Sequence, residues 1–253
     1  MENDGPGGGR WIEVAPDRLA RWLDSFAERH GGAAAEPGPG PATAEAGPGP
    51  ATAAAGPAVV TCRAADGAVA ECHVPFPPLR DGAPADGQTA QTAQAAGTCA
   101  EYGARIVAHA CADRTVGVFL VRLGGYAAGI FTGPAPALAA SKVGSRLVHG
   151  RSAAGGTSQH RFARRREKQA SEALGAAADT AVAVFGPYAG RIDAVVLGGD
   201  RRAIAQLRDD PRLAPYFGLA VERFLTVPDP RLTVLRGTPR LFRAIRIRLT
   251  GPA

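Results

Sequence analysis

Apolar residues near the start of the chain recur at the spacing of an amphipathic helix. Their three- and four-residue intervals place them on one side of such a helix. These positions are Leu19, Trp22, Leu23 and Phe26. Pro16 suits the first helical turn, and Asp17 favours the positive end of the helix dipole. We therefore predict a short strand from residue 10, then a helix that ends at Gly31–Gly32.

Two segments alternate in the manner of paired strands. Residues 58–79 form two alternating runs about Asp66–Gly67, a strong turn signal. Residues 115–133 form two more apolar runs around Gly124–Gly125. Both patterns predict hairpins, and residues 141–152 are expected to supply the next strand.

The second half of the chain then alternates helices and strands. We predict a helix over 159–178, a buried strand over 191–200, and a helix that starts at Asp200 and stops near Pro211. The remaining segments are a strand at 221–228, a partly helical stretch at 230–242 and a half-exposed strand at 243–250. Paired strands followed by alternating helices and strands indicate an α/β layer architecture with a mixed sheet.

Two stretches of low complexity interrupt the N-terminal part. Residues 32–57 consist almost entirely of Ala, Gly and Pro, and the unit GPGPATA occurs in them twice. Residues 81–98 are similarly simple. Such segments bury too little surface to offset the entropy of ordering them. We therefore expect a small N-terminal α+β unit over 1–111 with disordered inserts, and a second domain over 112–253.

Composition limits the size of the folded core and places the charge. The chain has 253 residues, of which 33 are Gly and 21 are Pro, and large apolar side chains are scarce. Residues 142–172 contain eight Lys or Arg residues and two Glu residues, which accounts for the whole excess of +6. This concentration favours a dedicated anion-binding surface, although a solvated helix face is the alternative.

Several classes of protein are disfavoured. The N-terminus has no signal-peptide pattern, and no apolar run is long enough for a membrane span. We expect a soluble, cytoplasmic monomer with reduced thiols. The cysteines are Cys62, Cys72, Cys99 and Cys111. With His73 and His109 nearby they still lack the paired spacing of zinc sites, so we expect neither a metal nor a cofactor.

The stretch RSAAGGTSQHRFARRREKQA, residues 151–170, is the best candidate for function. Gly155 and Gly156 lie among small residues, so the loop could enter a narrow space and bring its backbone close to a ligand. Thr157 or Ser158 is a suitable N-cap for the following helix. The Gly-Lys-[Ser/Thr] ending of a phosphate-binding P-loop is absent.

The helix after this loop has a basic face. On a helical wheel Arg161, Arg164, Arg165 and Lys168 share one side, and an apolar arc of Phe, Ala and Leu residues occupies the other. Arg166 falls within the apolar arc, where its side chain would snorkel. Together with Arg151 in the loop, these residues are predicted to contact RNA. Because aromatic residues are nearly absent, we expect contacts to backbone phosphates or to a structured RNA surface.

Gln159 is the candidate catalytic residue at the end of the loop. An amide has no useful pKa, so it cannot act as a general acid or base, but it can orient a water molecule. That suffices only where the partner supplies the remaining chemistry. The ester of peptidyl-tRNA in the ribosomal peptidyl-transferase centre is such a partner. An ordinary polar residue at a helix start is the alternative reading.

A hairpin, a strand, the loop AAGGTSQ and an Arg-rich helix follow one another over residues 112–253. This arrangement resembles the catalytic domain of the Vms-like release factors, which are related to the middle domain of eukaryotic and archaeal class-one release factors. The opening WIEVAPDRLARWLDSFAERHG is similar to their actinobacterial branch, described as peptidyl-tRNA hydrolases.

The resemblance implies a fold like that of ribonuclease H and a ribosome-rescue function. The partners would be the large ribosomal subunit, peptidyl-tRNA and ribosomal RNA. Gln159 matches the family's loop glutamine, and Gly155 and Gly156 match its glycines. Class-one release factors place Gln directly after Gly-Gly, whereas Thr157 and Ser158 intervene here, as in Vms-like proteins. This leaves the exact position of the water open.

The sequence is also compatible with activities other than peptidyl-tRNA hydrolysis. The family also offers scission of the tRNA near its 3′ CCA end, and a non-catalytic RNA-binding factor is a third reading. A two-metal nuclease built on Asp179, Asp193, Asp200 and Glu167 is disfavoured, because Asp200 suits a helix start and Asp193 a strand edge. His149 and His160 flank the loop and are interpreted as solvated residues.

Overall fold

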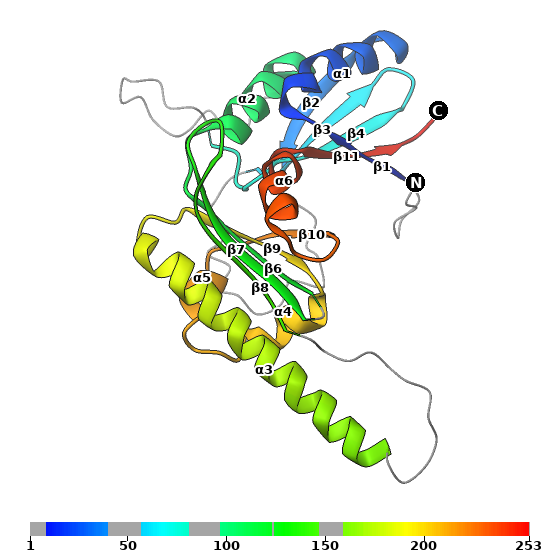
Figure 1. The fold of residues 1–253 in the computed structure, drawn as a ribbon. Helices are drawn as coiled ribbons and strands as arrows, with labels where there is room; N and C mark the ends of the chain where they lie inside the picture. The colour runs from blue at the N-terminus through cyan, green and yellow to red at the C-terminus, as the bar shows by residue number, and fades with distance from the viewer. Residues whose placement is uncertain (1–8, 40–56, 81–96, 123, 147–158, 253) are drawn as a thin grey trace. The chain divides into compact units, whose positions relative to one another are not determined.

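The chain forms two compact units, each with its own sheet (Figure 1). The computed structural model describes residues 9–39, 57–80, 97–122, 124–146 and 159–252, without the side chains of 159–167. The first unit comprises Met1–Ala112 and Arg243–Ala253, and the second comprises Asp113–Phe242.

The first unit is an antiparallel sheet with two helices on one face. Its strands are β1 (Arg10–Val14), β2 (Ala33–Gly38), β3 (Val59–Ala64), β4 (Val69–His73), β5 (Gly97–Thr98) and β11 (Ile245–Thr250). They are ordered β1-β11-β4-β3-β2-β5. Helices α1 (Pro16–Arg29) and α2 (Cys99–Cys111) cover the sheet through Leu19, Leu23, Phe26, Tyr102 and Ile106 (Figure 1). The predicted opening strand and helix and the hairpin at Asp66–Gly67 are confirmed.

Helix α2 was absent from our predictions, although its start carries a clear signal. The Thr98 hydroxyl accepts a hydrogen bond from Glu101 N, and the Glu101 carboxylate accepts one from Thr98 N, which together form a capping box. Gly103 then lets α2 approach α1, because a Cβ there would lie 2.6 Å from Leu23 Cδ1.

Part of the first low-complexity stretch is ordered, which corrects our prediction. Strand β2 pairs with β3 along its full length, and Ala35 is fully buried in the core. Backbone pairing and one small buried side chain stabilise a segment whose composition is typical of a linker. Gly97 and Thr98, from the second stretch, form the edge strand β5. The parts of these stretches at 40–56 and 81–96 lie outside the described residues.

The second unit contains the predicted mixed sheet. Its strands are β6 (Val116–Arg122), β7 (Gly125–Thr132), β8 (Ala137–Ser145), β9 (Ala194–Gly199) and β10 (Ala220–Leu225), ordered β10-β9-β6-β7-β8. Strands β10, β9 and β6 are parallel, whereas β6, β7 and β8 are antiparallel. Strand β8 lies earlier in the chain than expected, because its partner β7 pairs residues 137–145 despite their weak apolar pattern.

Helices cover both faces of this second sheet. They are α3 (Gln159–Phe185), α4 (Arg201–Leu207), α5 (Ala214–Phe217) and α6 (Leu232–Arg243), with a 3₁₀ turn at Gly186–Tyr188. Ala128 and Ile130 pack in the core beneath α3, whereas a Cβ on the intervening Gly129 would meet Leu235 of α6. Since neighbouring strand residues point to opposite faces, α3 and α6 lie on opposite sides of the sheet (Figure 1).

Candidate functional site

Helix α3 carries the candidate catalytic residue at its first position. The helix runs from Gln159 to Phe185, and 27 residues correspond to a length of about 40 Å. It extends beyond the predicted end at Ala178, because Ala181, Val184 and Phe185 continue the buried stripe. The first turns extend past the edge of the sheet in Figure 1. Gln159 is thus the start of a long helix anchored by its second half.

Alanines anchor α3 closely to the sheet. The buried residues of its second half include Ala173, Ala177, Ala178 and Ala181. Small side chains let the helix backbone approach β7, and Phe185 fills the space above Gly117 and contacts Phe119 edge-on. The predicted packing side of the helix is confirmed from Ala173 onward, and its basic side at Lys168 is exposed.

Among the other predicted site residues, the structure describes the side chain of Lys168. Gly155, Gly156, Thr157, Ser158, Arg151 and His149 lie outside the described residues. Residues 160–167 belong to α3, and their side chains are not described; they include His160, Arg161, Arg164, Arg165 and Arg166. Lys168 Nζ lies 4.0 Å from Glu172 Oε1, one helical turn away, and its side chain is 78% exposed.

The segment 147–158 starts from a defined end of the sheet. Strand β8 ends at Ser145 opposite Gly125, and Arg146 N donates to Gly124 O at 2.6 Å. Gly124 lies in the turn between β6 and β7 and Gly125 begins β7, at the end of the sheet where the parallel strands β6 and β9 also end. In open α/β sheets, ligands commonly bind outside the carboxyl ends of the parallel strands.

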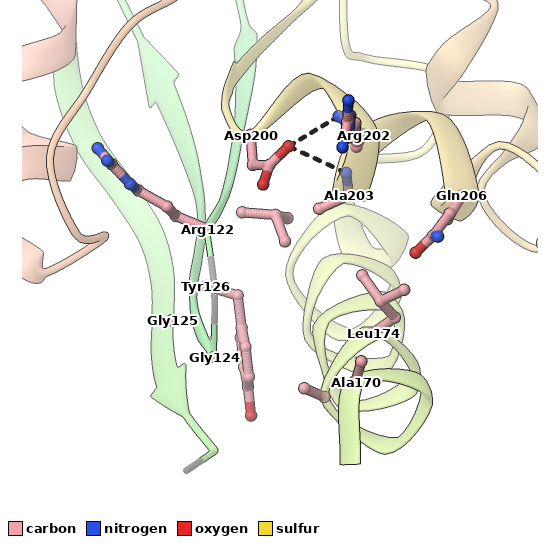
Figure 2. Close-up of a pocket in the computed structure, with 12 residues that line it drawn as sticks. Arg122, Gly124, Gly125, Tyr126, Ala170, Leu174, Asp200, Arg202, Ala203 and Gln206 are labelled. Atoms are coloured by element: carbon pink, nitrogen blue, oxygen red, sulfur yellow. Dashed lines mark hydrogen bonds between the residues drawn. The ribbon is translucent and has the colours of Figure 1, made fainter. Parts of the chain in front are cut away.

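A cavity of about 170 Å³ opens at the same end of the sheet (Figure 2). The β6–β7 turn and Tyr126 form one wall, and Ala170, Ala173 and Leu174 of α3 form the opposite one. Asp200, Arg202 and Gln206 contribute from α4 and its cap. The walls are mainly apolar, so the cavity suits one apolar side chain or a flat ring. Asp200 is the carboxylate in this lining, and its Oδ1 caps α4.

Asp200 fixes the loop between β9 and α4 beside this cavity. Its Oδ1 accepts hydrogen bonds from Arg202 N at 2.8 Å and Ala203 N at 3.4 Å, as an N-cap does. Gly199 has φ of +101°, and its backbone lies against Val121, where a side chain would not fit. The prediction that Asp200 starts a helix is confirmed.

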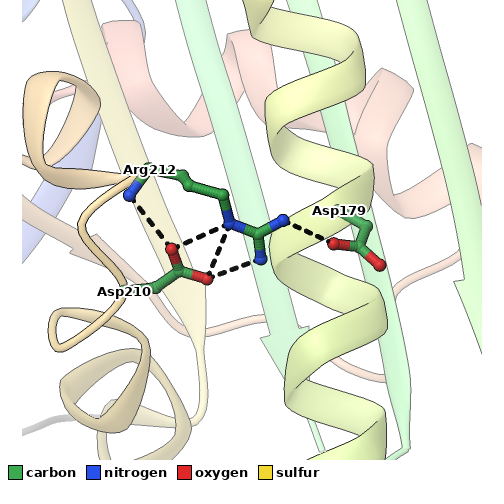
Figure 3. Close-up of polar contacts among 3 residues, drawn as sticks. All are labelled: Asp179, Asp210 and Arg212. Carbon is green, nitrogen blue, oxygen red and sulfur yellow. Dashed lines mark hydrogen bonds and ion pairs between the residues drawn. The ribbon is translucent and has the colours of Figure 1, made fainter.

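An ion-pair cluster holds the segment after α4 against α3 (Figure 3). Arg212 Nη2 donates to Asp210 Oδ2 at 2.7 Å, and Nη1 donates to Asp179 Oδ1 at 2.8 Å. The hydrogen bonds from the Arg212 side chain hold the pKa of Asp210 below its ordinary value. They also raise the pKa of Arg212, so the guanidinium stays charged. The cluster thus ties this segment to α3.

The carboxylates considered for a nuclease site have separate structural partners. Asp193 Oδ2 accepts from Thr115 N at 2.7 Å, just before β9, while Asp179 pairs with Arg212 and Asp200 caps α4. Glu167 belongs to the segment whose side chains are not described. Among the described residues, His, Cys, Asp and Glu nowhere gather in a group of three that could hold a metal ion.

Comparisons with known proteins place this second unit in a family. The pattern of the family described as "Actinobacteria/chloroflexi VLRF1 release factor" matches residues 114–248, more than half of the chain. The chain belongs to this family. The match includes Gln159 and all of α3, so the candidate loop and helix lie within the family's shared region. No curated protein matches the chain.

Two solved structures are similar at low sequence identity. One, titled "Crystal structure of archaeal translation termination factor, aRF1", is 14% identical with a TM-score of 0.38, over 69% of this chain and 46% of that one. The other, "Archaeal protein", is also 14% identical with a TM-score of 0.32, over 72% and 50% of the two chains. The matched region thus spans about half the length of these structures.

Sequence reasoning missed the apolar cavity. Its lining comes from three separate stretches of the chain, 121–126, 170–174 and 200–206, which no local pattern relates. One signal was available: the pair Gly198–Gly199 followed by Asp200 marks a close approach and a cap at a strand end.

In the part of the chain that the structure describes, no helix is long and apolar enough to cross a membrane.

Proposed function

We propose that this release-factor family member hydrolyses the ester of peptidyl-tRNA on the large ribosomal subunit. The observation that carries the proposal is the position of Gln159. It is the first residue of a helix of about 40 Å, it follows a loop of small residues, and it lies inside the region matched by the family. A slender loop on a long helix can reach a reacting ester deep in a narrow site.

The proposed reaction needs little from the protein itself. A water molecule adds to the ester carbonyl carbon, the bond from that carbon to the ribose 3′ oxygen breaks, and the oxygen takes up a proton. The products are a peptide with a free carboxyl group and a tRNA with a 3′ hydroxyl. Gln159 would orient the water through its amide, while ribosomal RNA and the neighbouring 2′-hydroxyl would supply proton transfer and charge stabilisation.

The loop and the basic helix have distinct roles in this proposal. Gly155, Gly156, Thr157 and Ser158 would bring the backbone close to the ester. The basic residues would bind phosphates of ribosomal RNA and tRNA; they are Arg151, Arg161, Arg164, Arg165, Arg166 and Lys168. Charge-assisted hydrogen bonds from guanidinium groups suit such phosphate contacts.

The test measures peptide release from large subunits that carry peptidyl-tRNA. Gln159→Ala should reduce release by roughly 100-fold, the scale of losing one group that positions a reactant. Gln169→Ala removes the same amide ten residues later in the same helix and should release peptide at the wild-type rate. If Gln159→Ala is as fast as wild type, the proposal is wrong.

The same reaction distinguishes hydrolysis from tRNA scission. The released tRNA is sequenced at its 3′ end, and hydrolysis leaves an intact CCA terminus. A shortened terminus would show that the protein is an endonuclease instead. Stable binding to the subunit without release of either product would support a non-catalytic factor.

A further inference from the structure

The charge of the chain has a second basic concentration that the overall balance conceals. Residues 230–253 contain six arginines and neither Asp nor Glu. Residues 142–172 carry an equal excess, so the rest of the chain has six more acidic than basic residues. We expected from the sequence that the whole positive excess lies in residues 142–172. The positive charge is instead concentrated in two segments, and the rest of the chain is acidic. Helix α6 lies within this second concentration.

Helix α6 presents two of these arginines on one face. Its buried side consists of Leu235, Thr238 and Phe242, and the Phe242 ring contacts Phe131 of the sheet at 6.0 Å between centroids. The opposite side is exposed. We call it the α6 arginine face, and its residues are Thr233, Arg236, Gly237 and Arg240. The spacing of three and four residues places all of them on a single stripe.

Within the part of the chain that the structure describes, the fold does not use the two arginines of this face. Among the described residues, neither Arg236 nor Arg240 takes part in an ion pair or a side-chain hydrogen bond. Arg122 differs, because it donates to the backbone carbonyl of Val227 and pairs with Asp229. Arg212 also differs, because it pairs with the carboxylates of Asp179 and Asp210. Fold stability therefore does not account for the two charges on α6.

Gly237, between the two arginines, points to close contact with another molecule. Glycine is unfavourable in the interior of a helix. Packing within the protein does not require a glycine at position 237, because a Cβ there would have no atom within 4 Å. A missing side chain between two cations leaves room for a ligand to approach the helix backbone.

We propose that the α6 arginine face binds the phosphate backbone of RNA, as a second contact separate from the basic part of α3. Guanidinium groups one helical turn apart can each donate paired hydrogen bonds to phosphate oxygens, and the Thr233 hydroxyl adds a donor. The chemistry reads no base, so the contact is independent of sequence. The proposal rests on the proposed function only in taking RNA as the partner.

Other anionic partners fit this face less well. A helix that binds a membrane surface inserts an apolar side, but the apolar side of α6 is buried against the sheet. Protein interfaces have cores rich in aromatic residues, and the centre of this face has only Thr, Gly and Arg. Phosphates need only cations, donors and access.

The test uses the full chain and a short fluorescein-labelled RNA duplex, with affinity measured by anisotropy across a range of KCl concentrations. Arg236→Gln with Arg240→Gln should weaken binding roughly tenfold and lower the slope of log K against log salt by about two, one for each lost phosphate contact. Arg18→Gln with Arg21→Gln removes the same charge from the exposed side of α1 and should change neither quantity comparably.

A second pair of variants separates the surface from folding. Gly237→Ala should keep or raise the thermal midpoint, since the site is open within the protein, but should bind RNA more weakly than wild type, because its methyl group takes up space that the ligand would use. Gly237→Glu should fold equally well but place a negative charge between the arginines, so RNA binding should fall at least as far as in the double arginine variant.

Two results would overturn the inference. One is wild-type RNA affinity for both the double arginine variant and Gly237→Glu. The other is an equal loss in the α1 control, which would indicate a general charge effect. Peptide release by Gln159→Ala is measured separately, so the proposed function can fail while this RNA contact stands, and the reverse also holds.

Discussion

Single polar atoms decide whether α6 can contain a proline. Pro239 has no N–H, so it cannot donate to Leu235 O, its partner one turn earlier. The Thr238 hydroxyl donates to that carbonyl instead, at 2.7 Å, and Thr238 is fully buried. A buried threonine thereby satisfies a carbonyl that the helix backbone leaves unpaired.

Replacing this hydroxyl should destabilise the second unit. Thr238→Val keeps the shape but leaves the carbonyl of Leu235 buried without a donor, at a cost of about 1–3 kcal/mol in the free energy of unfolding. Thr233→Val makes the same change on the exposed side and should cost less than about 0.5 kcal/mol. Urea titration of both variants measures the difference, and equal costs would contradict the role given to Thr238.

The Asp210–Arg212 pair predicts a dependence of stability on pH. Because the pKa of Asp210 is lowered in the folded protein, its stabilising contribution is present above the unfolded pKa of about 3.9 and is lost as pH falls through the lower folded pKa. Both groups are partly exposed, so solvent screening keeps the contribution at neutral pH small.

The corresponding measurement compares Asp210→Asn with wild type by thermal melts at several pH values. The variant should melt slightly lower at neutral pH, and the two curves should converge in acid. Asp209→Asn changes the neighbouring exposed carboxylate and serves as the control. A difference that persists unchanged in strong acid would argue against the ion pair as its source.

At the scale of elements, strong periodicity identified most helices and strands, and weak periodicity did not. The stripe in α1 and the apolar runs of β6, β7 and β9 are properties of their own sequences. Strands β2 and β8 are rich in alanine and depend on hydrogen bonds from neighbours far along the chain. Helix α2 had a local signal, Thr98 and Glu101, that we overlooked at the edge of a low-complexity stretch.

The candidate site shows the same division. The loop glutamine and the arginines of α3 could be identified because they are adjacent in sequence. The exposed arginines of α6 and the cavity beside Tyr126 depend on which helix side the sheet buries, and this follows only from tertiary packing. The likeness to ribonuclease H stays a prediction.

Two glycines in elements of the second unit should respond in opposite directions to alanine. A Cβ at Gly144 of β8 would lie 2.6 Å from the hydroxyl oxygen of Tyr126, so Gly144→Ala must displace a buried ring and should cost about 1–3 kcal/mol. Gly175 is exposed on α3 with open space around it, so Gly175→Ala should stabilise by up to about 1 kcal/mol. Chemical denaturation measures both, and a neutral Gly144→Ala would contradict this packing.

At the scale of the whole molecule, the two ends of the chain meet in one sheet. Our boundary at residue 112 placed the C-terminal strand with the second domain, whereas β11 lies between β1 and β4 and belongs to the first unit. Ile245 and Ile247 complete the core beneath α1 and α2. The alternation of this strand was evident in the sequence, but its pairing partners, more than 150 residues earlier, were not.

This topology predicts that the first unit depends on the last residues of the chain. Ending the chain after Arg243 removes a central strand, so the first unit should unfold while the second keeps its own sheet. Both tryptophans lie in the first unit, so their emission should shift to that of solvated indole. Burial raises the pKa of the Cys99 thiol to about 12 in the intact protein, which makes it unreactive, and truncation should expose it to thiol reagents. Removing only Pro252 and Ala253 leaves β11 complete and should change neither signal. Native tryptophan emission after the longer truncation would mean that β1 and β4 form a stable unit without β11.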